Sequence, residues 1–130
     1  MNSGGAPSGT LWMRAASALE VLTGVGLIAT PSLLARLLFG SNLNGAGEAT
    51  GRIAGLVMVC LAAGCWPRDA ENTQSHGLIA LAALSWLAAG FLVVSGAIGA
   101  NVGLLLWPAA VVHLTLAILL TRAWMESRRS

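Results

Sequence analysis

Charge is scarce in this chain of 130 residues. Asp, Glu, Lys and Arg together make up 9% of the sequence, whereas a soluble domain carries about 25%. Lysine and tyrosine are both absent, and all seven basic residues are arginine. So little charge cannot cover a water-facing globule, which argues against a soluble enzyme, a nucleic-acid-binding protein and a disordered chain. With 56% hydrophobic residues, the composition predicts an integral membrane protein of one domain.

Cysteine and the common catalytic motifs are also scarce. Cys60 and Cys65 both lie in one apolar segment, where a helix would separate them by about 7.5 Å along its axis. A disulfide tolerates a Cα separation of about 7 Å at most, so we expect two thiols that pack as small apolar groups. The sequence contains no H-E-x-x-H, G-x-S-x-G, phosphate-binding loop or C-x-x-C motif, which argues against an enzyme and against a metal site.

The long apolar segments predict four membrane spans. They cover residues 11–30, 49–66, 76–99 and 103–124, each close to the roughly 20 residues that cross a bilayer core. Residues 31–39 begin with Pro31 and carry Arg36 among leucines, which is typical of a short interfacial helix. Residues 1–10 should be disordered, and residues 125–130 form a charged tail. The predicted fold is an all-α, four-transmembrane-helix bundle with an interfacial helix after the first span.

The arginines predict the orientation of the spans. An even number of spans places both termini on one side of the membrane. That side would hold most of the positive charge, namely Arg14, Arg68, Arg122, Arg128 and Arg129. The other side would hold only Arg36 and Arg52. Because cytoplasmic loops carry an excess of arginine, we expect both termini in the cytoplasm of a bacterium, with the chain in the inner membrane.

Small residues recur every four positions in two places, a spacing that lets helix backbones approach closely in lipid. The first series lies at the start of the second span and comprises Gly47, Gly51 and Gly55. The second series crosses the turn before the fourth span and comprises Ser95, Gly99 and Gly103. We interpret both series as helix-packing positions inside the bundle. The alternative is a docking face for another subunit.

Three polar residues lie inside predicted spans and form a candidate cluster. Glu20 is near the middle of the first span, Arg52 enters the second, and His113 is at a depth similar to that of Glu20 in the fourth. A charge at the bilayer centre costs at least about 2.5 kcal/mol, so Glu20 should face the bundle interior. Pro108 should kink the fourth span beside His113.

The cluster has a functional and a structural interpretation. A Glu20–Arg52–His113 group could relay protons, bind a quinone head group or ligate a metal, although one Glu and one His are too few for a metal site. Alternatively, Glu20 and Arg52 pin two helices together, and His113 donates a single hydrogen bond. If Glu20 pairs with Arg52, the substitution Glu20→Leu should disturb folding.

Two stretches carry a family resemblance. PSLLARLLFG at residues 31–40 follows the first span, and GEATGRIAG at residues 47–55 opens the second. This organisation, which covers about the first half of the chain, resembles small four-span bacterial proteins of the DoxX-like kind. The resemblance implies a four-helix bundle and an association with redox or quinone-linked membrane complexes. It transfers no catalytic residue, because the family has no shared catalytic motif.

Three functions are compatible with these patterns, in decreasing order of preference. The first is a non-catalytic accessory or assembly subunit of a larger membrane complex, with the bilayer and other membrane subunits or further copies as partners. The second is a redox module that binds a quinone, the one cofactor considered, at Glu20, Arg52 and His113. The third is a small oligomeric transporter or proton path.

Overall fold

The structure is a computed structural model that describes residues 8–67, 71–99 and 102–129, and within these ranges it contains helices and no strands. The helices are α1 (Ser8–Ala29), α2 (Pro31–Phe39), α3 (Gly45–Gly64), α4 (Glu71–Ile98) and α5 (Leu106–Ser127). All except α2 contain segments long and apolar enough to cross a membrane. The predicted all-α, four-span architecture is confirmed.

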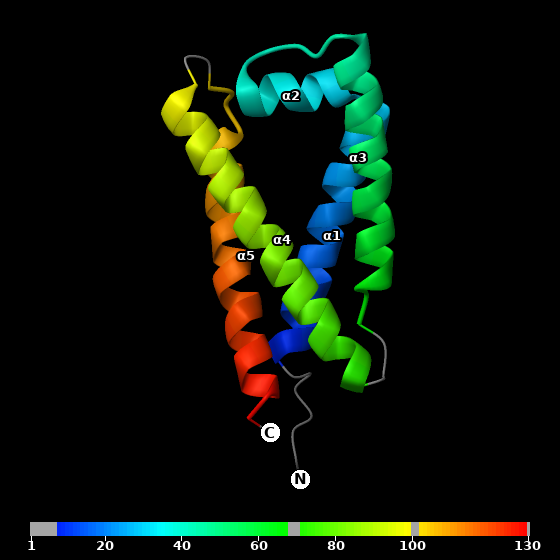
Figure 1. Cartoon of the computed structure of the whole chain (residues 1–130), viewed down its shortest axis with the longest axis vertical. Coiled ribbons are helices and arrows are strands. Elements are labelled where there is room, and N and C mark those ends of the chain that lie inside the picture. The colour runs from blue at the N-terminus through cyan, green and yellow to red at the C-terminus, as the bar shows by residue number, and fades with distance from the viewer. Residues whose placement is uncertain (1–7, 68–70, 100–101, 130) are drawn as a thin grey trace.

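The long helices form two antiparallel pairs, α1 with α3 and α4 with α5. In Figure 1, α1 runs away from the end of the molecule that holds both termini, and α2 lies across the opposite end. From there α3 returns, α4 runs up again and α5 comes back to the C-terminus. The two pairs meet near the termini and diverge toward α2.

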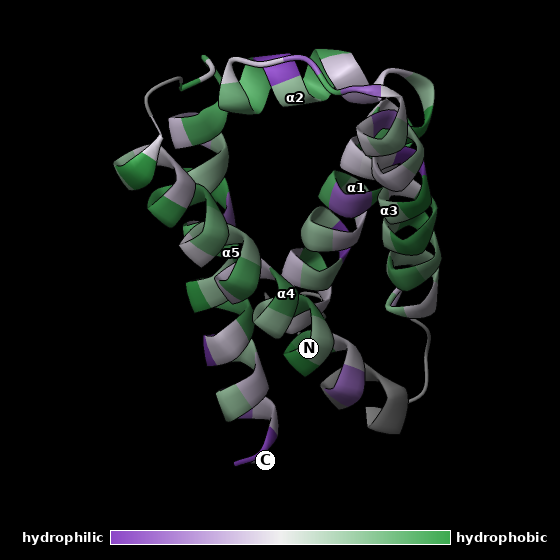
Figure 2. Ribbon diagram, turned by 45° about the horizontal axis from the view of Figure 1, so that its top comes forward, coloured by the Kyte–Doolittle hydropathy of each residue, from purple (hydrophilic) through white to green (hydrophobic). Residues whose placement is uncertain are grey.

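The outer faces of the long helices are apolar. Leu22, Leu87 and Val111 are among the large hydrophobic side chains that are more than half exposed. In Figure 2, hydrophobic residues cover most of the long helices, and hydrophilic residues gather beside α2 and at the C-terminus. Exposed apolar helices of this length are suited to contact with lipid.

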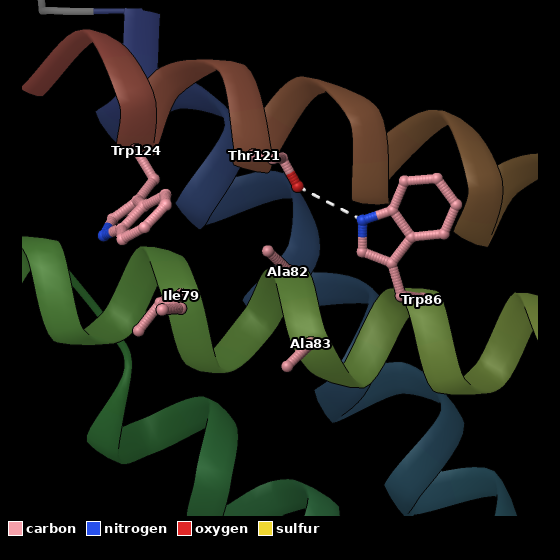
Figure 3. A pocket seen from close by; sticks show the side chains of 6 residues that line it. All are labelled: Ile79, Ala82, Ala83, Trp86, Thr121 and Trp124. Carbon is pink, nitrogen blue, oxygen red and sulfur yellow. Dashed lines mark hydrogen bonds between the residues drawn. The ribbon is translucent and has the colours of Figure 1, made fainter.

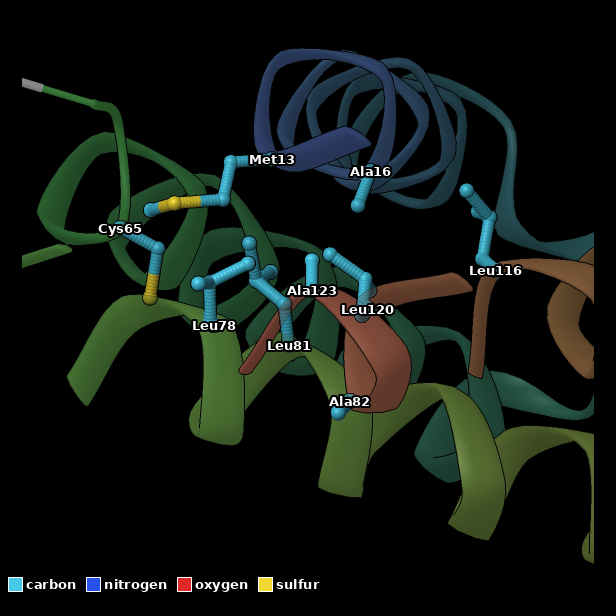
Figure 4. Packing of buried hydrophobic residues seen from close by; sticks show 9 residues of the cluster. All are labelled: Met13, Ala16, Cys65, Leu78, Leu81, Ala82, Leu116, Leu120 and Ala123. Atoms are coloured by element: carbon cyan, nitrogen blue, oxygen red, sulfur yellow. The ribbon is translucent and has the colours of Figure 1, made fainter. Parts of the chain in front are cut away.

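The main hydrophobic core lies where the two pairs meet, near the termini. Figure 4 shows that its side chains come from α1, α4, α5 and the end of α3. Its members are Met13, Ala16, Cys65, Leu78, Leu81, Ala82, Leu116, Leu120 and Ala123. Cys60, by contrast, is exposed. The core therefore holds the two pairs together at one end of the molecule only.

A second contact joins the pairs at the other end through α2. The backbone N–H groups of Gly103 and Leu105 donate hydrogen bonds to the carbonyls of Leu38 (3.0 Å) and Leu37 (2.8 Å). Phe39 meets Phe91 of α4 edge to face, with 6.0 Å between ring centroids. The C-terminal half of α2 is thereby docked on the α4–α5 pair.

The ends of α2 match the sequence prediction of residues 31–39. Pro31 occupies the first turn, where a missing N–H costs no helical hydrogen bond. Gly40 ends the helix in the left-handed conformation, with φ 68°, and its N–H donates to the Arg36 carbonyl. This conformation is accessible to glycine without steric strain.

The first glycine series packs inside the molecule, on α1 and α2. A Cβ at Gly55 would lie 2.5 Å from the carbonyl oxygen of Gly24 in α1, and a Cβ at Gly51 would lie 3.0 Å from Pro31. The Gly47 N–H donates to the side chain of Asn44, which caps α3. The internal-packing interpretation therefore describes Gly51 and Gly55 well.

The second series departs from the expected arrangement. Gly99 lies beyond the end of α4, and Gly103 lies before α5, so Ser95, Gly99 and Gly103 do not form one helical face. A Cβ at Gly103 would collide with the carbonyl oxygen of Leu37 in α2. Gly103 is therefore a contact between the α4–α5 connection and α2.

Several helices extend beyond the predicted spans. Three begin earlier than expected, with α1 at Ser8, α3 at Gly45 and α4 at Glu71, whereas α5 begins later, at Leu106. Residues 8–10 are helical, so the expected disorder there is wrong, and residues 1–7 lie outside the described range. Pro108 falls in the first turn of α5, where it interrupts no helical hydrogen bond. The prediction of a proline kink within this helix is therefore wrong.

Candidate functional site: a buried polar layer

Four polar residues lie on the inner faces of α1, α4 and α5, and we call them the polar layer. They are Ser17, Glu20, Ser85 and His113. The first three are buried, with the Glu20 side chain only 2% exposed, and His113 is half-buried. An ionisable side chain so deeply buried in a membrane-spanning helix marks a functional-site hypothesis.

The helical register places the polar layer directly above the main core, on its side toward α2. In α1, Ser17 and Glu20 each lie four residues after a core residue, Met13 and Ala16. Residues three or four apart share one face of a helix. On the inner face of α1, Ser17 and Glu20 therefore lie about one turn farther from the termini than the core residues.

In α4 and α5, the polar residue also lies about one helical turn from a core residue, on the side away from the termini. Ser85 lies three residues after Ala82 in α4, and His113 lies three residues before Leu116 in α5. The chain direction of α5 is opposite to that of α1 and α4. A residue of α5 that lies farther from the termini than Leu116 therefore has a lower residue number, as His113 does. By this spacing, Glu20 and His113 occupy similar depths.

Three atoms of the polar layer are buried without a hydrogen-bond partner. They are Ser17 Oγ, Glu20 Oε2 and His113 Nδ1. A buried polar atom that lacks a partner costs about 1–3 kcal/mol, so such atoms are uncommon in folded proteins. Three of them on two neighbouring helices indicate a site suited to a hydrogen-bonding ligand.

Arg52 lies outside the polar layer. Its side chain is exposed on α3, and within the described ranges no ion pair joins it to Glu20. The reason is its helical position, because neighbouring residues on a helix point about 100° apart and Gly51 faces Pro31. Of the three residues of the predicted cluster, Arg52 is therefore exposed, whereas Glu20 is buried and His113 is half-buried.

Glu48, four residues before Arg52, has a different partner. Its Oε1 accepts a hydrogen bond of 2.6 Å from the Ser32 hydroxyl in α2. This bond joins the first turns of α2 and α3 and anchors the N-terminal end of α2. Together with the docking of Phe39, it holds α2 across the end of the molecule.

Sequence reasoning did not identify Ser85 as part of the layer. A serine in an apolar span carries little signal by itself, because its hydroxyl can bond to its own helix. Its spacing from core residues becomes informative only once the core is known. Among the described residues, no group of three His, Cys, Asp or Glu side chains could hold a metal ion.

Comparison with known proteins finds no matching family model, no similar curated protein and no matching solved structure.

Proposed function

We propose that this chain is a small multi-pass membrane protein that binds and exchanges a proton at Glu20 inside the bilayer. The observation that carries this proposal is the Glu20 carboxyl, which is 2% exposed and has one oxygen without a partner. Chains of Glu and His residues are the usual proton carriers within membrane helices. His113, at similar depth on α5, supplies the second group.

The burial of Glu20 favours a proton over a larger ligand. A quinone head group could reach a side chain that is 2% exposed only if the helix pairs separated. A proton needs no such movement. In the exchange, the O–H bond of the Glu20 carboxyl breaks and an N–H bond forms at the unpartnered Nδ1 of His113, directly or through a water molecule. The Ser17 hydroxyl can donate or accept a hydrogen bond beside this path.

The test is infrared difference spectroscopy of the protein in lipid nanodiscs during a pH jump. We expect a carboxyl C=O band whose intensity changes with pH, and we expect Glu20→Gln to remove it. Glu126→Gln, which changes an exposed residue at the end of α5, is the matched control and should leave the band in place. A pH response that is the same in wild type and Glu20→Gln would overturn the proposal.

A chemical extraction separates the proton from the quinone alternative. We expect organic extracts of the purified protein to contain no stoichiometric quinone. Quinone recovered from wild type but not from Glu20→Gln would replace the proton site with a quinone site.

A second candidate function rests on Arg52. We propose that the chain is also an accessory or assembly subunit of a larger membrane complex, with the exposed face of α3 as its contact. Arg52 lies about 10 Å along the axis from the start of α3. An arginine inside a membrane helix pairs with another group or extends to the interface. A partner's acidic side chain would satisfy it.

Affinity purification in mild detergent tests this second function. We expect larger membrane subunits to co-purify stoichiometrically with the tagged protein, and Arg52→Gln to reduce their yield. Arg36→Gln is the matched control, because Arg36 is exposed on α2 at the same end of the molecule. A protein that purifies alone, as a stable monomer, would contradict the proposal.

We further propose a location in a bacterial inner membrane, with both termini in the cytoplasm. Arg14, Arg122, Arg128 and Arg129 lie toward the end that holds the termini, which supports this orientation. Arg68 lies outside the described residues. Kinship with DoxX-like proteins is likewise a proposal, supported by the order of α1, the proline-led α2 and the glycine-rich start of α3.

A further inference from the structure

The outer surface of the α4–α5 pair carries a groove that is separate from the polar layer. Figure 3 shows this groove between the two helices. Its volume is about 250 Å³, and it is lined by Ile79, Ala82, Ala83, Trp86, Thr121 and Trp124. It lies in the half of the molecule near the termini, and its lining residues Ile79, Ala83 and Trp86 are exposed, so it opens on the outer surface of the pair.

The shape of the groove follows from its side chains. The alanines of α4 leave space between the two indole rings, which lie toward opposite ends of the groove in Figure 3. Trp86 is 47% exposed, and its Nε1 donates a hydrogen bond of 3.2 Å to Thr121 Oγ1. The Thr121 hydroxyl donates in turn to the Ala117 carbonyl (2.6 Å). The Trp86 end of the groove is thereby held in place.

The other end of the groove carries a positive charge. The Arg128 guanidinium lies over the Trp124 ring, 5.0 Å from its centroid. Thr121 and Trp124 are three residues apart on one side of α5, and Arg128 caps the end of that helix four residues after Trp124. The cation–π contact keeps the guanidinium beside the groove, and tryptophan at a helix end is typical of the membrane interface.

We propose that the groove binds an acyl chain of an anionic phospholipid whose phosphate pairs with Arg128. The arrangement suits a molecule that is apolar along its length and anionic at the end nearest the termini. A guanidinium pairs with phosphate through parallel hydrogen bonds. A lipid in the surrounding leaflet presents its acyl chain and its phosphate in this order, with the phosphate at the interface.

Lipid titrations of the detergent-solubilised protein, followed by native mass spectrometry, test the proposal. The probes are phosphatidylglycerol and phosphatidylcholine with identical acyl chains. We expect phosphatidylglycerol to bind about fivefold more tightly than phosphatidylcholine. This factor corresponds to the free energy with which one arginine is attracted to an anionic membrane surface. Equal affinity of the wild type for the two lipids would overturn the proposal.

Two variants and a control locate the binding. Arg128→Gln should remove most of the preference for phosphatidylglycerol, whereas Arg36→Gln, at the opposite end of the molecule, should keep it. Ala83→Trp fills the groove from an exposed position and should weaken the binding of both lipids. A preference that persists in Arg128→Gln would contradict the role of the guanidinium.

A final measurement separates a lipid from a free phosphate, which shares the headgroup chemistry. Inorganic phosphate should not displace phosphatidylglycerol at comparable concentrations, because it does not contact the groove. Displacement by inorganic phosphate, together with unchanged lipid binding in Ala83→Trp, would show that Arg128 binds phosphate alone and that the groove holds no chain.

Discussion

Close contact between α1 and α3 depends on two glycines. A Cβ on Gly24 would lie 2.7 Å from the Gly55 carbonyl oxygen, and a Cβ on Gly55 would lie 2.5 Å from the Gly24 carbonyl oxygen. Each glycine therefore accommodates the backbone of the other helix. The four-residue spacing in the sequence indicated Gly55, but only the packing of the two helices identifies Gly24 as its counterpart.

Gly55→Ala should destabilise the protein, because the added methyl group meets backbone that cannot move independently. We expect a loss of about 1–3 kcal/mol in the free energy of unfolding, typical of overpacking. Gly90→Ala is the control, since a Cβ there would meet nothing within 4 Å, and it should stabilise the helix by up to about 1 kcal/mol. Reversible unfolding in detergent measures both. Equal effects of the two substitutions would contradict the close packing.

The loss of folding expected for Glu20→Leu depended on an ion pair between Glu20 and Arg52. Because Arg52 is exposed and Glu20 Oε2 has no partner, Glu20→Leu should not break an ion pair. We expect the free energy of unfolding to rise by about 1–3 kcal/mol, the cost of the unpaired buried group, while the pH-dependent carboxyl band disappears. The same unfolding experiment measures the change. A marked loss of stability would instead show that the carboxylate has a stabilising partner.

For α2, local residues determine that a helix forms, whereas contacts with distant segments determine where the helix lies in the molecule. Pro31 and Gly40 mark its ends in the sequence, and the structure has the helix at Pro31–Phe39. Its position depends on contacts distant in the chain, from Ser32 to Glu48 at one end and from Leu37 and Leu38 to the segment before α5 at the other. No local pattern in residues 31–40 indicates those partners.

Phe39→Ala should loosen the docking of α2 on the α4–α5 pair. The substitution removes the edge-to-face contact with Phe91, and such a pair contributes about 0.5–1.5 kcal/mol beyond its buried area. We expect faster hydrogen exchange at the amides of Gly103 and Leu105, which donate to α2 carbonyls.

The control for this experiment is Leu33→Ala, because Leu33 of α2 is 45% exposed. It should leave the exchange of both amides unchanged. If Phe39→Ala also leaves them unchanged, the aromatic contact does not hold α2 in place.

At the scale of the whole molecule, the helix pairs are joined at both ends by different means. Near the termini the join is the hydrophobic core, and at the other end it is α2. The polar layer lies between them, next to the core. This arrangement places Glu20 away from either end of α1 and accounts for its burial.

The position of both termini at one end gives a topology prediction. A fluorescent protein fused after residue 130 should fluoresce, because it folds in the cytoplasm. Alkaline phosphatase inserted at residues 41–44, between α2 and α3, should be active, because it requires the opposite side. As the control, alkaline phosphatase is fused after residue 130 and the fluorescent protein is inserted at residues 41–44, and both should be inactive. The reverse pattern would show that the orientation proposed from the arginines is wrong.

The sequence could predict the number and approximate position of the helices, because apolar run length and terminal Pro and Gly residues act locally. It could not predict all helix ends. Asn44 caps α3 by bonding to the Gly47 N–H, and so the helix starts four residues before the apolar run.

The sequence by itself determined that the chain suits a lipid environment, that it has four apolar spans, and that an acidic residue lies within the first span. These follow from composition and from patterns within single helices. Only the tertiary structure decided that α1 pairs with α3 and α4 with α5, that Arg52 points outward, and that Ser17, Glu20, Ser85 and His113 share one layer. The physical reason is that helix pairing depends on which small residues meet across two helices, as Gly24 and Gly55 do.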